Sequence, residues 1–219
     1  MTADERLSAF YEQRAAEEPA SDPEALLRFD KAIVAAALRP GERVLDVGAK
    51  WGGLAARLPD GVAYTGLELS EENVRRATVD VRHADVTKAL PVGDAEFDCV
   101  FVLELLEHLT APLALLEEAH RVLEPDGRAV VSVPSPYSWV EVYRELVCRH
   151  DPEGHLNAYT TPVMTNLAAL AGFRVERRLG TSIRIPRTTL LVSTDSILAR
   201  SRIYVLRPSE RVVFAGRTL

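Results

Sequence analysis

The residues whose types and spacing could do chemistry gather first in residues 44–58, which read Val-Leu-Asp-Val-Gly-Ala-Lys-Trp-Gly-Gly-Leu-Ala-Ala-Arg-Leu. An apolar β-type run enters a glycine-bearing turn here, and we expect an amphipathic helix to leave it. Gly48 and Gly52 have no Cβ, so the backbone of the turn can approach a ligand closely. Asp46 adds a carboxylate at the same edge. This strand–turn–helix pattern is typical of α/β proteins that bind nucleotide-like ligands.

A second carboxylate supports a nucleotide-type ligand without choosing which one. Glu68 lies about 20 residues after Gly48, where an acidic residue at the end of the second strand accepts hydrogen bonds from ribose hydroxyls. A dinucleotide pattern would need glycine at positions 48, 50 and 53, and Lys50 instead obstructs the approach to a pyrophosphate. The turn therefore disfavours NAD and suits a ligand that has no pyrophosphate.

A parallel sheet must position these residues, and the rest of the chain predicts one. The pattern predicts strands at residues 43–47, 62–67, 78–83, 97–103, 129–133, 173–178 and 203–206. It predicts helices at residues 3–18, 22–38, 111–123, 137–148 and 161–171, and another that begins at Ser70. This alternation indicates an α/β fold: a doubly wound, Rossmann-like, seven-stranded and mostly parallel sheet, with helices on both faces and N-terminal helices as a lid.

Four segments in order resemble class I S-adenosylmethionine-dependent methyltransferases. They are the glycine turn, Ala84-Asp85-Val86 after the third strand, residues 90–109 around the fourth strand, and residues 117–134 leading into the fifth. One departure is Lys50, which stands where the family usually has a second glycine. Gly154-His155, Tyr159-Thr160 and residues 171–173 also resemble small-molecule methyltransferases, less specifically.

The resemblance implies S-adenosylmethionine as the cofactor and a set of residues that contact it. These are Tyr11 as an aromatic lid, Asp46, Gly48, Ala49, Lys50 and Gly52 in the turn, Glu68 and Leu69 at the ribose, Asp85 and Val86 near the adenine, and Leu103 and Glu104 through their backbone. Three alternatives stay open. Asp46 could pair with backbone N–H groups of its own turn, Asp85 could only form a turn, and the Lys50 ammonium could point to solvent or to the carboxylate of the ligand.

The same resemblance implies an in-line displacement at a sulfonium-activated methyl carbon, in which the protein contributes chiefly by positioning. A general base matters only for a hydroxyl or a protonated amine acceptor. The first candidate for that base is His155 and the second is His108, which could instead order the following loop. We expect no metal, because the cluster His150, Asp151, Glu153 and His155 lies in a polar loop without regular ligand spacing.

The composition of the chain limits its domain number, its partners and its compartment. The 219 residues, 47% hydrophobic and 26% charged, suit one domain over 1–219, with a helical cap (1–40), a cofactor-binding half (41–134) and an acceptor-side half (135–219). A net charge of −6 disfavours nucleic acid as a partner. The two cysteines are too few for a disulfide framework, and no secretory or membrane-spanning segment is visible, so we expect a cytoplasmic protein. We expect a small-molecule acceptor and a monomer or homodimer.

Two other function classes remain open. One is an NAD-dependent oxidoreductase on a Rossmann fold, because fold does not determine function. The other is a non-catalytic S-adenosylmethionine-binding partner of another enzyme, which would bind the cofactor tightly and never turn it over. Methylation of a protein or of tRNA is a nearer alternative. The acidic charge balance disfavours tRNA, and no peptide-recognition element is evident in the sequence.

Overall fold

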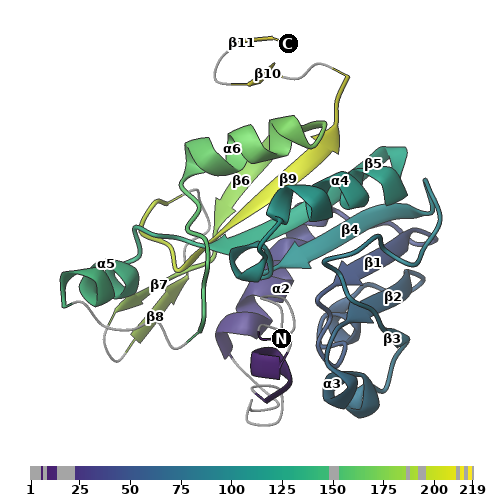
Figure 1. Ribbon diagram of the computed structural model, residues 1–219, viewed down its shortest axis with the longest axis horizontal. Coiled ribbons are helices and arrows are strands. Elements are labelled where there is room, and N and C mark those ends of the chain that lie inside the picture. Colours follow the sequence, from purple (N-terminus) through teal and green to yellow (C-terminus); the bar gives the residue numbers. More distant parts are fainter. Residues whose placement is uncertain are drawn as a thin grey trace.

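The computed structural model describes residues 6, 9–13, 23–147, 153–185, 188–191, 196–210, 213–214 and 217–218. One sheet has the strand order β3-β2-β1-β4-β5-β9-β6 (Figure 1). Its strands are β1 Arg43–Val47, β2 Ala63–Glu68, β3 Val81–His83, β4 Phe97–Leu103, β5 Leu123–Pro134, β6 Phe173–Gly180 and β9 Ser201–Pro208. β9 is antiparallel to β5 and β6, and the other neighbours pair in parallel. This order confirms the predicted doubly wound, seven-stranded fold.

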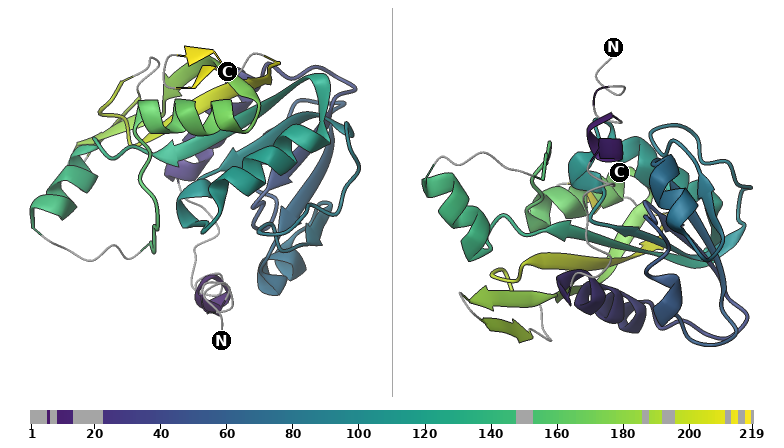
Figure 2. Two further views of the ribbon diagram at one scale, coloured as in Figure 1. Left: turned by 45° about the horizontal axis from the view of Figure 1, so that its top comes forward. Right: turned by 90° about the horizontal axis from the view of Figure 1, so that it is seen from below.

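Helices cover both faces of the sheet (Figure 2). They are α2 Pro23–Ala36, α3 Glu71–Arg76, α4 Pro112–Val122, α5 Trp139–Leu146 and α6 Thr161–Leu170. α2 contacts β5 and β9 on one face, whereas α4 and α6 contact each other and the other face. In β4, Cys99 and Phe101 belong to the core beneath α2, and Val100 and Val102 belong to the opposite core. The apolar run at 97–103 is therefore a strand buried on both faces, as its sequence predicts.

The prediction of an amphipathic helix after the glycine turn is wrong. Only a short 3₁₀ turn, Ala55–Arg57, forms there. Leu58 follows in an extended conformation, with φ −67° and ψ 148°, and the next residue is Pro59. Because the ring of a proline disfavours the helical conformation of the residue before it, Pro59 stops the helix before a second turn can form.

Other differences concern the extent of elements. β3 is shorter than the expected 78–83, and β5 begins at Leu123 rather than at 129, because Phe97 pairs with Leu123 across a register shift. Two small antiparallel hairpins were not predicted: β7 Ser182–Ile185 with β8 Thr188–Leu191, and β10 Val213–Phe214 with β11 Arg217–Thr218. Most of the helix expected at 3–18 lies outside the described residues, although residues 9–13 are helical. α2 packs against the sheet, so the predicted lid reduces to the segment around residues 9–13.

The carboxyl ends of the central strands meet at one edge of the sheet. Val47 of β1 lies opposite Leu67 of β2 on one side and Val102 of β4 on the other. The residues that follow these strands therefore share one edge, where open α/β sheets bind ligands. A 3₁₀ turn, Leu106–His108, continues from β4 at this edge. In the described ranges, no helix is both long and apolar enough to cross a bilayer.

Candidate functional site

The turn after β1 has a left-handed backbone at three positions. Gly48, Lys50 and Gly52 have φ of +78°, +50° and +82°. A Cβ on Gly48 would lie 3.1 Å from Cδ2 of Leu105, so the glycine lets the turn pack closely against the segment that follows β4. A Cβ on Gly52 would lie 2.3 Å from Cγ2 of Val79, so this glycine is required by packing as well. Lys50 adopts a left-handed conformation that suits glycine, and this conformation costs a residue with a side chain roughly 1–2 kcal/mol of stability.

Glu68 is held at the end of β2 by two backbone groups. Its Oε2 accepts a hydrogen bond from Lys50 N at 2.9 Å, and its Oε1 accepts one from Ser70 N at 2.8 Å. The side chain is buried, but a carboxylate has about four acceptor positions, which leaves capacity for a diol. The backbone of Lys50 is thus fixed by Glu68, while its Nζ lies 5.9 Å from the Trp51 ring centre.

Asp46 is buried beside Glu68 and pairs with a tyrosine. Its Oδ2 accepts a hydrogen bond from the Tyr64 hydroxyl at 2.9 Å, so Asp46 pairs with this side chain. Burial raises the pKa of Asp46 to about 7; the Tyr64 hydrogen bond opposes this shift and the nearby Glu68 adds to it. Sequence reasoning missed Tyr64, because an aromatic residue in a strand reads as core.

Asp85 closes a turn after β3. Its Oδ1 accepts hydrogen bonds from Thr87 N at 3.1 Å and Thr87 Oγ1 at 2.6 Å, and its Oδ2 pairs with Lys88 Nζ at 2.8 Å. Burial raises the pKa of Asp85, but the hydrogen bonds from Lys88 and Thr87 outweigh it, and the net shift is downward. The turn-forming role weighed from the sequence is present, and an adenine contact stays a prediction. The Val86 side chain packs in the core.

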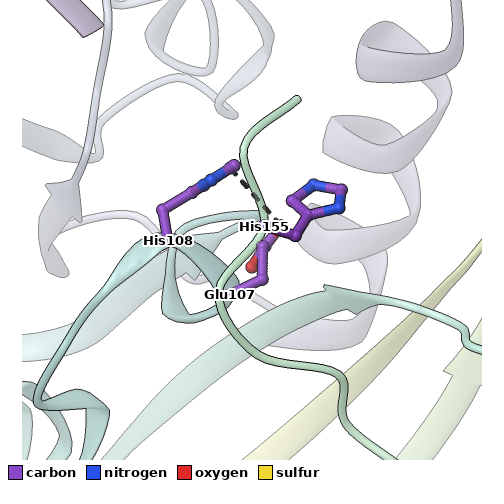
Figure 3. Close-up of side chains that lie close together, drawn as sticks. All are labelled: Glu107, His108 and His155. Carbon is purple, nitrogen blue, oxygen red and sulfur yellow. Dashed lines mark ion pairs between the residues drawn. The ribbon is translucent and has the colours of Figure 1, made fainter. Parts of the chain in front are cut away.

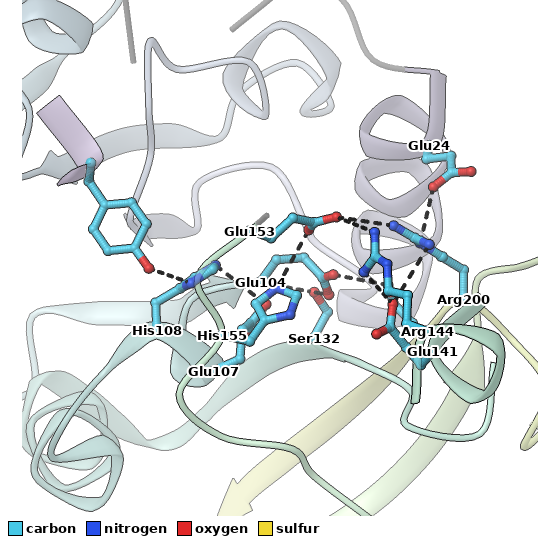
Figure 4. Close-up of polar contacts among 12 residues, drawn as sticks. Glu24, Glu104, Glu107, His108, Ser132, Glu141, Arg144, Glu153, His155 and Arg200 are labelled. Carbon is cyan, nitrogen blue, oxygen red and sulfur yellow. Dashed lines mark hydrogen bonds and ion pairs between the residues drawn. The ribbon is translucent and has the colours of Figure 1, made fainter. Parts of the chain in front are cut away.

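Glu104 directly follows Leu103 of β4 and turns its side chain inward. Its φ is +51°, and its backbone N donates to Ser132 O at 3.0 Å. Its carboxylate accepts a hydrogen bond from Ser132 Oγ at 2.8 Å (Figure 4). It also accepts one from Ser201 Oγ at 3.0 Å and lies 3.8 Å from Arg28 Nη1. Glu104 therefore joins β4 to β5, β9 and α2 through its side chain, which the sequence did not indicate.

Both histidines proposed from the sequence meet a buried glutamate at the end of β4 (Figure 3). The rings of His108 and His155 lie 4.9 Å apart, and His108 Nε2 lies 3.9 Å from Glu107 Oε1. We call Glu107, His108 and His155 the acceptor-side cluster. The Tyr11 hydroxyl lies 2.6 Å from His108 Nδ1, so Tyr11 covers this cluster. Leu156 N donates to Glu107 O at 2.7 Å, which holds the loop carrying His155 in place.

Sequence reasoning missed Glu107. The only signal was a carboxylate next to His108 directly after a strand buried on both faces, and it was weighed only together with that histidine. Of the loop cluster named from the sequence, Glu153 and His155 are described, and His150 and Asp151 lie outside the described residues. Glu153 Oε2 lies 3.5 Å from His155 Nε2, and Glu107 comes from a distant segment.

Comparison with known proteins identifies the family. A family model for a methyltransferase domain matches residues 13–177. The chain belongs to this methyltransferase family. It is a class I S-adenosylmethionine-dependent methyltransferase, with S-adenosylmethionine as its cofactor. Membership favours S-adenosylmethionine over NAD, a choice that Glu68 by itself left open.

The methyltransferase has relatives among curated proteins. It is 37% identical over 115 residues to 27-O-demethylrifamycin SV methyltransferase of Amycolatopsis mediterranei, covering 45% of this chain and 42% of the relative. It is 32% identical over 131 residues to the ubiquinone biosynthesis O-methyltransferase of Dechloromonas aromatica, covering 52% and 55%. An uncharacterised protein of a Streptomyces fradiae transposon is 30% identical over 196 residues, covering 81% and 54%. The chain spans about half the length of these relatives.

Solved structures share the fold. A SAM-dependent methyltransferase from Thermotoga maritima matches with a TM-score of 0.66 and 20% identity, over 82% of this chain and 89% of that one. The [4+2]-cyclase SpnF matches with a TM-score of 0.64 and 20% identity, over 85% and 80%. At such identities the likeness concerns the fold alone, and a cyclase among the neighbours illustrates that one fold hosts different reactions.

The described edge fits the cofactor. Gly48 presents backbone without a Cβ at this edge, and Glu68 is fixed there with acceptor capacity to spare. Asp46 places a buried carboxyl group beside them, and this group would favour a cationic ligand when ionised. No pyrophosphate has to pass Lys50 in S-adenosylmethionine, so the departure at that position is compatible with this ligand.

Proposed function

We propose that the protein transfers a methyl group from S-adenosylmethionine to a hydroxyl oxygen of a small molecule. The observation that carries the proposal is the acceptor-side cluster, which places two imidazoles and a buried carboxyl group beside the end of β4. Methylation of a hydroxyl oxygen requires loss of its proton, and imidazole is the side chain best suited to accept one near neutral pH. Relatives named as O-methyltransferases support the same choice of atom.

The cofactor-binding side and the acceptor side of the site have different roles in methyl transfer. Bound S-adenosylmethionine supplies a methyl group activated by its sulfonium. Glu68 orients the ribose. The other proposed contacts to the cofactor come from Tyr11, Asp46, Gly48, Ala49, Lys50, Gly52, Leu69, Asp85, Val86, Leu103 and Glu104. Holding the acceptor oxygen in line with the methyl group supplies most of the rate enhancement through proximity and orientation.

His155 is the first candidate to receive the acceptor proton. Glu153 Oε2 lies 3.5 Å from His155 Nε2, so this contact orients the ring. His108 is the second candidate; the Tyr11 hydroxyl at its Nδ1 orients the ring, so its Nε2 faces Glu107. The hydroxyl of nearby Tyr159 donates a hydrogen bond to Leu106 O at 3.1 Å. Burial raises the pKa of Tyr159, which suits a structural role rather than proton transfer.

Calorimetric titration with S-adenosylmethionine, S-adenosylhomocysteine and NAD, followed by turnover assays, tests the proposal. We expect binding of the first two ligands, and a methylated product by mass spectrometry from phenolic or other hydroxylated acceptors. Matched acceptors whose hydroxyl is already methylated serve as the control. Binding of NAD alone would overturn the cofactor assignment. Tight binding of S-adenosylmethionine without turnover on any hydroxylated acceptor would instead favour the non-catalytic partner or another reaction.

A further inference from the structure

The acceptor-side cluster brings three potential metal ligands together. One ligand atom from each of Glu107, His108 and His155 lies within 4.8 Å of the other two. Ligands of one metal ion at about 2.0–2.2 Å from it would lie up to roughly 4.4 Å apart, so small side-chain rotations would close the site. Glu107 and His108 come from the turn after β4, and His155 comes from the segment before α6 (Figure 3).

Glu107 is an unusual residue in this position. Its side chain is 1% exposed, and both of its carboxylate oxygens lack a hydrogen-bond partner within the described part of the chain. A buried carboxylate without a hydrogen-bond partner is strongly unfavourable, and proteins normally pair such a group or use it to coordinate a metal. The two orphan oxygens therefore point to a ligand that the described residues do not supply.

Among the described residues, the polar network around Glu107 holds more carboxylates than guanidinium groups (Figure 4). The five carboxylates of this network are those of Glu24, Glu104, Glu107, Glu141 and Glu153, and its three guanidinium groups are those of Arg28, Arg144 and Arg200. Arg200 pairs with Glu24, Glu141 and Glu153, and Arg144 pairs with Glu141 and Glu153. Each guanidinium thus already faces another carboxylate, and a cation of charge +2 would neutralise the excess.

The two histidines carry outer partners of the kind that orient metal-bound imidazoles. Such a ring usually ligates through one nitrogen while the other contacts a carboxylate or another oxygen. His108 meets the Tyr11 hydroxyl through Nδ1, and its Nε2 lies on the side of Glu107. His155 meets Glu153 through Nε2 at 3.5 Å, so a carboxylate lies beside this ring as well.

We propose that Glu107, His108 and His155 bind a divalent transition-metal cation on the acceptor side of the site. Two imidazoles and one carboxylate suit Zn²⁺, Co²⁺, Mn²⁺ or Fe²⁺, whereas Mg²⁺ and Ca²⁺ prefer oxygen ligands. Three protein ligands leave a coordination position for the acceptor hydroxyl, as in catalytic metal sites. The inference rests on the proposed function for its role, and it changes that of His155 from base to ligand.

The chemistry of this role balances without a further reagent. A hydroxyl bound to the cation loses its proton to solvent, because a bound metal ion lowers the pKa of oxygen ligands. An electron pair of that oxygen forms the new bond to the methyl carbon, and the electrons of the carbon–sulfur bond go to sulfur. The products are the methyl ether and S-adenosylhomocysteine, and the metal ion is unchanged.

Metal binding by the full chain, measured apart from activity, tests the proposal. After treatment with a chelator and its removal, the wild type is titrated with Co²⁺ by calorimetry and visible absorption. We expect one Co²⁺ per chain, with an affinity that falls by more than about tenfold in Glu107→Gln and in His155→Gln. His83→Gln, which changes an exposed histidine of β3, is the matched control and should bind like the wild type. No binding, or equal binding in all four proteins, overturns the proposal.

Two further measurements separate folding and cofactor effects from metal binding. Without metal, Glu107→Gln should melt at or above the wild-type temperature, because it replaces an unpartnered buried carboxylate; Co²⁺ should raise the melting temperature of the wild type only. An equal rise in both proteins contradicts the site. Titration with S-adenosylmethionine tests the proposed function separately: its failure with intact Co²⁺ binding overturns that function and leaves the metal site standing.

Discussion

The cofactor edge and the acceptor-side cluster differ in how their polar atoms are satisfied. At the cofactor edge, Glu68 receives two backbone N–H groups and Asp46 receives the Tyr64 hydroxyl. At the acceptor-side cluster, both carboxylate oxygens of Glu107 lack a hydrogen-bond partner among the described residues. The carboxylates of the first region are therefore paired within the fold, whereas that of Glu107 has no hydrogen bond from the described residues.

The difference also concerns distance along the chain. Asp46, Lys50, Tyr64 and Glu68 belong to one strand–turn–strand unit, whereas the contacts of the acceptor-side cluster join residues 11, 107–108 and 153–157. A unit that binds a ligand shared by a whole family can be built locally, and the part that faces the acceptor is assembled from separate segments. Substitutions in the two regions should accordingly have different consequences, and four predictions test this.

The largest expected effect is the pH dependence of stability from Asp46. Its pKa is raised from 3.8 to about 7 in the folded protein, so its contribution to stability is fully present below about pH 4 and is lost as the pH rises to about 7. Relative to Asp46→Asn, the wild type should lose up to about 4 kcal/mol of unfolding free energy across this window. Urea denaturation of both proteins from pH 4 to 8 measures it; parallel curves would show that Asp46 is not perturbed.

Gly52→Ala should destabilise the turn by about 2–4 kcal/mol, because the new Cβ meets Val79 and the left-handed backbone disfavours a side chain. Gly41→Ala is the matched control, since Gly41 has φ +90° and nothing within 4 Å of its Cβ position. The control should lose only the backbone part, about 1 kcal/mol. Thermal and urea unfolding compare the two; equal losses would mean that packing against Val79 contributes nothing.

Glu68→Ala should weaken S-adenosylmethionine binding by roughly 1–3 kcal/mol, because the ribose hydroxyls lose their acceptor and the Lys50 and Ser70 N–H groups lose theirs. Calorimetry gives the affinity. Glu71→Ala, at the start of α3, is the control that removes a nearby exposed carboxylate. Unchanged affinity in Glu68→Ala would remove the ribose assignment and leave Glu68 a structural residue of the turn.

The smallest effect belongs to the acceptor-side cluster. Tyr11→Phe removes the hydroxyl that contacts His108 Nδ1 and should lower turnover up to about tenfold, about 1 kcal/mol, with little change in protein stability. Tyr137→Phe, which changes an exposed tyrosine, should have no effect. Steady-state kinetics with a hydroxylated acceptor measures it. If the unfolding free energy of Tyr11→Phe fell as far as that of Gly52→Ala, the two regions would not differ in their contribution to stability.

The sequence predicted most of the fold because the information was local. Strand and helix periods, the glycine turn and the carboxylate after the second strand each depend on neighbouring residues, and their order indicated both the sheet and the cofactor. The one wrong element, the helix after the turn, could have been excluded by Pro59, whose effect on Leu58 is also local.

Only the tertiary structure decided how the candidate site is assembled. Lys50 in the family's glycine position reads as a departure in the sequence, whereas the folded turn shows it keeping the left-handed backbone, with its N–H bound by Glu68. Tyr11, His108 and His155 were each proposed singly, and chain folding brought them together around Glu107, whose burial no local pattern reveals. The physical reason is that burial and pairing of a charged group depend on segments distant in the chain, while backbone conformation depends mainly on adjacent residues.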